Sequence, residues 1–328
     1  MHQTTRQPAS PVPQEWRRLR QIINDSRRII RVHSAGPIDC GVEECPIYGV
    51  ELGAETDVPT FVVVAGIHGL ERVGIQVALH FLEAVLARSS WDPSAQALLA
   101  RSRLVVLPIA NPAGLFLGRR GNGDGIDLMR CAPVDARDRP PLLAGGHRLG
   151  NALPWYRGKR DAQMPAEARA VTAIFDHLAA RSTFLMSIDL HSGFGNRDRI
   201  WYPWAHRRDP FPDARHMPSL CNLLDTSLPH HVYRIEPQGD SYTAHGDLWD
   251  WLWLHLRTRQ GFSAPFLPLT LEMGSWIWVR KNPRQLLSRY GLFNPVVPHR
   301  HARVMRRHLP LLEFLWRAAS VPERWLRR

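Results

Sequence analysis

The sequence has no long hydrophobic run. No stretch approaches the ~18 consecutive apolar residues that a membrane-spanning helix needs, so we expect no membrane span. Cysteine is also scarce: Cys40, Cys45, Cys131 and Cys221 include no Cys-x-x-Cys pair and are too few for a disulfide scaffold in 328 residues. We expect reduced thiols, although Cys40 and Cys45 flank a segment short enough for a bridge.

Lysine is nearly absent, and this changes how the positive charge is interpreted. Of the 42 basic residues only Lys159 and Lys281 are lysines, while the formal net charge is +12 and the pI is near 10.5. Such a charge often indicates nucleic-acid binding. However, no run of Lys and Arg exceeds two residues, and the arginines are scattered through segments with helical spacing, as on solvated helix faces. We therefore expect no nucleic-acid partner.

The first residues contain no apolar stretch of the kind found in a signal peptide. Residues 1–14 are polar and Pro-rich, and we expect them to be flexible. A cytoplasmic location is the corresponding expectation. Residues 15–328 are expected to form a single domain, because α/β domains of about this size commonly fold as one unit.

The rest of the chain alternates apolar runs with helical patterns. Hydrophobic residues make up 44% and charged residues 22%, which suits a globular protein with a sizeable core. Strands are expected at 60–65, 103–109, 184–190 and 265–272, an extended segment at 46–52, and helices at 15–33, 74–88, 165–181 and 299–319. Strands this apolar indicate a mixed or parallel sheet covered by helices, hence an α/β fold. Residues 131–160 are rich in Pro, Gly and Arg and predict a long loop.

Polar side chains stand at or just after the ends of these apolar runs, where ligands of open α/β sheets gather. They are His68, Asn111, His191 and Glu272. Glu71 follows His68 by three positions, so both can point to one side once the chain turns helical. A His-x-x-Glu pair or a single histidine at a strand end often arises by chance. Two histidines and one carboxylate, however, leave a zinc ion with an open position for water, as in catalytic sites.

A glycine-rich segment after the second run places arginines near this cluster. Residues 120–130 read Arg-Gly-Asn-Gly-Asp-Gly-Ile-Asp-Leu-Met-Arg. Alone, the segment is typical of a solvated loop. Beside a cationic metal, guanidinium groups are costly unless they bind an anion, so Arg120 and Arg130 are candidate substrate contacts.

Over about residues 55–295 the sequence resembles the zinc carboxypeptidases of the pancreatic carboxypeptidase A type. The resemblance implies a mixed, mostly parallel twisted sheet with helices on both faces, and one zinc ion per chain. It also assigns roles to residues: His68, Glu71 and His191 as zinc ligands, Asp127 as the partner of His68, Arg120 (or the adjacent Arg119) as the oxyanion-stabilising arginine, Arg130 as the clamp for a substrate carboxylate, Tyr242 as the mobile tyrosine, and Glu272 as the general base.

The implied reaction is hydrolysis of a C-terminal amide bond in a peptide by zinc-activated water. The implied partner is a peptide or acyl-amino-acid substrate with a free carboxylate. One departure from the family is Met129, which stands where asparagine is usual beside the clamp arginine. Alternatives are a deacylase of small N-acyl amino acids similar to succinylglutamate desuccinylase and aspartoacylase, a murein-peptide amidase, and a binding protein without activity.

The candidates for contacting the terminal side chain of the substrate are two residues that follow the mobile tyrosine in the sequence, Asp247 and Trp249. Trp249 falls where the family sets specificity, and its bulk would shorten the pocket; alternatively, it is a core residue. Asp247 would favour a terminal residue that carries an amine. The alternative for Asp247 is a helix N-cap.

Overall fold

The computed structural model describes residues 12–259 and 262–326, so residues 1–11 of the expected flexible start lie outside the described part. Within this part, one mixed sheet has the strand order β1-β2-β4-β3-β5-β8-β6-β7. The strands are β1 (Arg31–Asp39), β2 (Glu44–Gly53), β3 (Val58–Ala65), β4 (Arg103–Leu107), β5 (Ser182–Ser192), β6 (Arg199–Tyr202), β7 (Arg234–Pro237) and β8 (Phe266–Met273).

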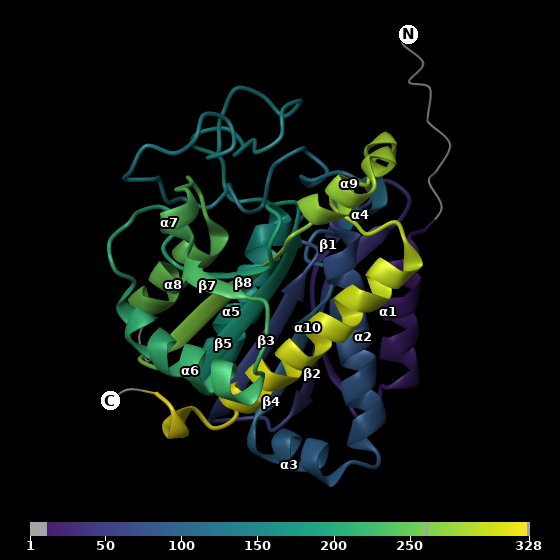
Figure 1. The fold of residues 1–328 in the computed structure, drawn as a ribbon, viewed down its shortest axis with the longest axis vertical. Helices are drawn as coiled ribbons and strands as arrows, with labels where there is room; N and C mark the ends of the chain where they lie inside the picture. Colours follow the sequence, from purple (N-terminus) through teal and green to yellow (C-terminus); the bar gives the residue numbers. More distant parts are fainter. Residues whose placement is uncertain (1–11, 260–261, 327–328) are drawn as a thin grey trace.

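Helices cover both faces of this sheet, with α2 and α10 on one face and α5 and α8 on the other (Figure 1). The α-helices are α1 (Gln14–Asp25), α2 (Arg72–Ser89), α3 (Pro93–Arg101), α4 (Pro112–Leu117), α5 (Ala166–Ala179), α6 (Met217–Ser227), α7 (Gln238–Ser241), α8 (Leu248–Thr258), α9 (Trp276–Lys281) and α10 (Pro298–Ala319). Short 3-10 turns occur at Pro212–His216, Pro283–Leu287 and Pro322–Arg324. In the described part of the chain, no helix is both long and apolar enough to span a bilayer.

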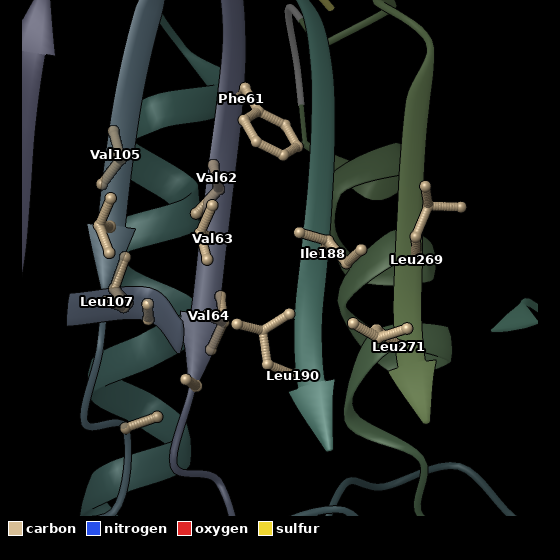
Figure 2. Packing of buried hydrophobic residues seen from close by; sticks show 14 of the residues in the cluster. Phe61, Val62, Val63, Val64, Val105, Leu107, Ile188, Leu190, Leu269 and Leu271 are labelled. Atoms are coloured by element: carbon tan, nitrogen blue, oxygen red, sulfur yellow. The ribbon is translucent and has the colours of Figure 1, made fainter. Parts of the chain in front are cut away.

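The centre of the sheet is parallel and fully buried. Strand β3 pairs in parallel with β4 and β5, and β5 pairs in parallel with β8. Neighbouring residues such as Val62 and Val63 point to opposite faces and both are inaccessible to solvent (Figure 2). Burial on both faces explains why the sequence shows continuous apolar runs here instead of alternation. The α/β fold with a mixed sheet is therefore confirmed, and the antiparallel pairs are β1 with β2, β2 with β4, and β6 with β8.

The expected helix at 15–33 is too long, because α1 ends at Asp25 and the chain enters β1 at Arg31. The helical pattern stops at the sequence Asn-Asp-Ser, whose side chains compete with the helical backbone for hydrogen bonds. Strand β1 is an edge strand and about half exposed, and its charged residues give it no apolar run by which the sequence would indicate a strand. Arg31 and His33 both pair with the buried Glu51 of β2.

The other predicted elements agree with the structure to within a few residues, and the extended segment at 46–52 is part of β2. The segment 131–160 contains no helix or strand apart from one isolated bridge, as the composition predicts. It lies at the same end of the molecule as α7 and α9 (Figure 1). All four cysteines are free thiols, and Cys40 and Cys45 are buried.

Candidate active site

Three neighbouring parallel strands deliver the candidate residues to one edge of the sheet. His68 and Glu71 lie in the turn between β3 and α2, while His191 lies near the carboxyl end of β5. Glu272 stands directly opposite His191 on β8. The fourth strand-end residue, Asn111, has a structural role, because it caps α4 and donates a hydrogen bond to the carbonyl of Ile67.

The ligand atoms of His68, Glu71 and His191 lie within 4.8 Å of one another, and all three side chains are buried. The Nδ1 atoms of the two histidines are 3.1 Å apart, and Glu71 places Oε1 2.9 Å from Nδ1 of His68 and Oε2 3.3 Å from Nδ1 of His191. Two imidazole nitrogens and a carboxylate that converge in this way form the donor set of a catalytic zinc site. The residues present therefore fit zinc.

The opposite ring nitrogens of both histidines are held by carboxylates. Nε2 of His68 lies 3.1 Å from Oδ1 of Asp127, and Nε2 of His191 contacts Oδ2 of Asp189. A carboxylate behind a metal-binding histidine fixes the ring orientation and makes the other nitrogen a better ligand. This arrangement supports Asp127 as the partner of His68. Asp189 has the same position behind His191.

The charges of the cluster shift its ionisation equilibria in a consistent direction. Burial alone would raise the pKa of Glu71, but His68 and His191 outweigh it and lower that pKa. Burial would lower the pKa of His191, yet the adjacent carboxylates of Asp189 and Glu71 raise it well above the ordinary value. Burial would also raise the pKa of Asp127, but the positive charges of Arg120 and His68 outweigh it, and this pKa falls well below its usual range. Both carboxylates are thus anionic at neutral pH.

Sequence reasoning missed the supporting role of Asp189 and its contact with Trp249. The indole Nε1 of Trp249 donates to Oδ2 of Asp189 at 2.9 Å, and both side chains are buried. Asp189 is two residues before His191 on a strand, hence on the same side, which was a usable signal. The contact with Trp249, 60 positions away, had no such signal.

We expect Trp249→Phe to weaken zinc binding by about 10–100-fold, the usual cost of losing a group that supports a metal ligand. Phenylalanine keeps the ring in the core but removes the donor to Asp189. Trp253→Phe is the matched control, because Trp253 lies on the same helix and donates to Asp213 instead. The measurement is zinc affinity by competition with a chelator. Equal affinities in the two variants would contradict a supporting role for Trp249.

Arg120 links the two carboxylates that flank His68. Its Nε donates to Oδ2 of Asp127 at 2.8 Å and its Nη1 to Oε1 of Glu71 at 3.2 Å. The side chain remains about 20% exposed, so it borders both the metal ligands and the solvent-facing part of the site. Arg119, the alternative, is exposed and its guanidinium contacts only the carbonyl of Gly123 among the described residues.

Glu272 is the least satisfied carboxylate near the cluster. Its Oε2 is buried and has no hydrogen-bond partner among the described residues. Burial, opposed by His191 and reinforced by Glu71, raises the pKa of Glu272 to about 8. A bound zinc cation would lower this value. The side chain can therefore exchange a proton near neutral pH.

Arg130 and Tyr242 meet across the site. Nη2 of Arg130 lies 3.3 Å from the hydroxyl of Tyr242, while the other guanidinium nitrogens donate to the carbonyls of Met129 and Ala144. Ala144 brings the 131–160 loop into contact with this buried arginine. Among the described residues, no carboxylate forms an ion pair with Arg130, so its guanidinium group can bind the carboxylate of a substrate.

The two specificity candidates are both buried beside the start of α8. Asp247 is the N-cap of this helix, because its Oδ1 accepts from the backbone N–H groups of Trp249 and Asp250. The capping interpretation is thus confirmed. Burial and the neighbouring Asp250 raise the pKa of Asp247 to about 7. Both candidates line a small cavity of about 10 Å³, together with Trp201 and Thr270.

A sequence profile for the family described as zinc carboxypeptidase matches residues 19–275. Carboxypeptidase A4 of Mus musculus is 25% identical over 226 residues, which are 64% of this chain and 51% of that protein. Carboxypeptidase SOL1 of Arabidopsis thaliana is 28% identical over 110 residues, or 32% of this chain and 22% of that protein. The matched part of this chain thus spans about half or less of the length of these relatives.

Solved structures share the architecture. The thrombin activatable fibrinolysis inhibitor aligns with a TM-score of 0.67 and 15% identity, covering 92% of this chain and 71% of the other. A metallo-carboxypeptidase from Burkholderia cenocepacia aligns with a TM-score of 0.57 and 14% identity, covering 94% and 69%. At these identities the likeness concerns the fold.

Proposed function

Because the chain belongs to the zinc carboxypeptidase family, we propose that it hydrolyses the C-terminal amide bond of a peptide. The observation that carries the proposal is the convergence of His68, Glu71 and His191, with Nδ1 of both histidines turned toward Glu71 and Glu272 alongside. These three ligands would hold one zinc ion. When bound, zinc supplies a Lewis acid and lowers the pKa of a coordinated water toward about 7.

The residues of the chain supply the proton transfers and the positioning. Glu272 accepts a proton from the attacking water at Oε2, the atom without a partner, and later delivers it to the leaving amine. Arg120 donates to the oxygen on which negative charge develops. Arg130 receives the terminal carboxylate of the substrate, and the hydroxyl of Tyr242 borders the same place.

Blocking the terminal carboxylate of a peptide as an amide should sharply reduce hydrolysis, because Arg130 then loses its anionic partner. Arg130→Ala should raise KM for the free acid with a smaller effect on kcat, and it should discriminate little between acid and amide. Steady-state kinetics on an acid and amide pair of one peptide measures both effects. Equal rates for acid and amide in the wild type would exclude exopeptidase action. The replacement of the usual asparagine by Met129 would then indicate that the family's carboxylate clamp is altered in this chain.

The same assay separates the alternatives. Small N-acyl amino acids and a murein tripeptide should be poor substrates beside the free-acid peptide, since the family match does not favour a deacylase. Fastest cleavage of an N-acyl amino acid would support the deacylase. No turnover of any compound by zinc-loaded protein would support a binding protein.

We further propose that the terminal residue preferred by the site carries an amine. The cavity that Trp249 and Asp247 line is about 10 Å³, room for about one water, so a phenyl ring does not fit there, whereas an ammonium group at the end of a side chain is about the size of that water. Asp247 lines the same cavity, and its Oδ2 has no hydrogen-bond partner among the described residues.

A lysine-terminated peptide should therefore be cleaved faster than its phenylalanine-terminated counterpart. With the pKa of Asp247 at about 7, its charge develops between pH 6 and 8, so the ratio of the two rates should rise over this range. Asp247→Asn keeps the size of the side chain and the helix cap but removes the charge. We expect this variant to lose the preference for the lysine-terminated peptide. A ratio that is independent of pH and of this substitution would leave Asp247 as a cap alone.

A further inference from the structure

A cavity of about 500 Å³ is lined by residues of α9 and of the N-terminal half of α10 and by none of the zinc ligands. These two helices are labelled in Figure 1. We call this cavity the basic cavity. Its charged lining consists of Arg197, Lys281, Arg300, Arg303, Arg307 and a single carboxylate, Asp198. Neither Glu272 nor Arg120 lines it. A volume of this size is within the ~300–1,000 Å³ range of small-molecule sites.

Among the described residues that line the basic cavity, Asp198 is the one carboxylate, and both of its oxygens accept a hydrogen bond. Oδ2 of Asp198 accepts a hydrogen bond from Nη1 of Arg307 at 2.6 Å, and Oδ1 accepts one from the backbone N–H of Gly274 at 2.9 Å. Arg300 donates to the carbonyl of Trp278. The side chains of Arg197, Lys281 and Arg303 line the cavity, are exposed to solvent, and make no hydrogen bond or ion pair with any described residue. Three cations of the cavity therefore have no anionic partner among the described residues.

The helix that forms one wall of the basic cavity adds to this positive potential. The N-terminus of a helix carries a partial positive charge and normally attracts acidic side chains. The first turn of α10 instead contains no acidic residue and no side-chain cap, and its His299 and Arg300 line the cavity. From the other side, the last turn of α9 contributes Lys281. Like charges gathered against a helix N-terminus repel one another, and a bound anion relieves this repulsion.

We propose that the basic cavity binds a small molecule that carries two or more phosphate groups. Guanidinium groups pair with phosphate oxygens bidentately, and a lysine ammonium adds a point charge. Charges placed on both α9 and α10, and on the segment that contains Arg197, match an anion with more than one charged group. This binding is independent of the peptidase activity and does not rest on the proposed function.

The test compares two doubly substituted variants of equal net charge. Lys281→Gln with Arg303→Gln removes two unpaired cations from the basic cavity. Arg280→Gln with Arg306→Gln removes two exposed cations from the same two helices that do not line it. Binding of tripolyphosphate to the zinc-loaded protein is measured by titration calorimetry at 150 mM salt. Orthophosphate and citrate are the comparison anions.

The proposal predicts one tripolyphosphate per chain, bound at least tenfold more weakly by the cavity variant and with unchanged affinity by the control variant. Orthophosphate and citrate should bind more weakly than tripolyphosphate. An equal loss in both variants would show a response to net charge, and equal affinity of all three proteins would place the anion elsewhere, for example on zinc. Either result, tighter binding of citrate, or no binding at all would overturn the proposal.

Discussion

Glu272→Gln should retain the fold and zinc while losing about 10²–10⁴ of the turnover rate, the typical cost of removing a general base. Glutamine preserves the size of the side chain but has no basicity. The structure makes this carboxylate sensitive to the exchange, because its Oε2 has no hydrogen-bond partner among the described residues and is free to accept a proton.

The pH profile identifies the role more sharply than the rate alone. Glu272 acts as a base only when deprotonated, so kcat/KM of the wild type should rise with pH as the carboxyl group ionises. Burial raises the pKa of Glu272 to about 8, and the bound cation shifts the rising limb to lower pH. This limb should be absent from the residual activity of Glu272→Gln.

Glu167→Gln is a suitable control, because Glu167 is also buried, burial also raises its pKa, and its bond from Asn122 can be kept by glutamine. We expect near wild-type turnover from it. Wild-type rates in zinc-loaded Glu272→Gln would reject this glutamate as the base. A loss of zinc in that variant, measured by metal analysis, would assign it to the metal site instead.

The centre of the fold and the zinc ligands could be predicted because their signals are local. Each central strand is a continuous apolar run, and His68, His191 and Glu272 stand at the ends of three such runs. Parallel strands bring their carboxyl ends to one edge, so strand ends far apart in sequence meet without any knowledge of the loops. His68 and Glu71 need only one turn of chain to converge.

The edges of the sheet could not be predicted in the same way. Strands β6 and β7 have four residues each, too short for a recognisable period. Strand β1 carries Arg31 and His33 at alternate positions, and both pair with Glu51 of the next strand. Its polar character is explained by a buried ion-pair cluster that becomes visible only after the strands pair.

The residues around the site follow from tertiary contacts, and this is where sequence interpretation was weakest. Trp249 had two interpretations from sequence, a wall of the substrate pocket or a core residue, and neither indicated that its buried indole nitrogen donates to Asp189 behind a zinc ligand. Asp247 had two interpretations from sequence, and the backbone geometry of α8 establishes the cap. Which way a side chain points from a helix start depends on what packs against that helix.

Arg120→Ala should lower kcat by about 10²–10³, equivalent to about 3–4 kcal/mol of lost transition-state stabilisation, while changing KM little. Arg120 reaches from Asp127 to Glu71 and keeps part of its surface exposed, so its guanidinium can meet the oxygen that gains charge during the reaction. Arg130→Ala acts on a ground-state anion and should change mainly KM. The contrast between these two variants separates the roles.

A structural role for Arg120 must be distinguished from the electrostatic one, because the substitution also removes a partner of Asp127, which orients His68. Zinc content should be measured for each variant, and kinetics compared only at full occupancy. Arg119→Ala is the matched control: Arg119 is the neighbouring residue, is exposed, and was the alternative candidate from sequence. We expect wild-type kcat from it. A larger loss of kcat in Arg119→Ala than in Arg120→Ala would transfer the oxyanion role to Arg119, whereas full recovery of Arg120→Ala by added zinc would show that Arg120 acts only through the metal ligands.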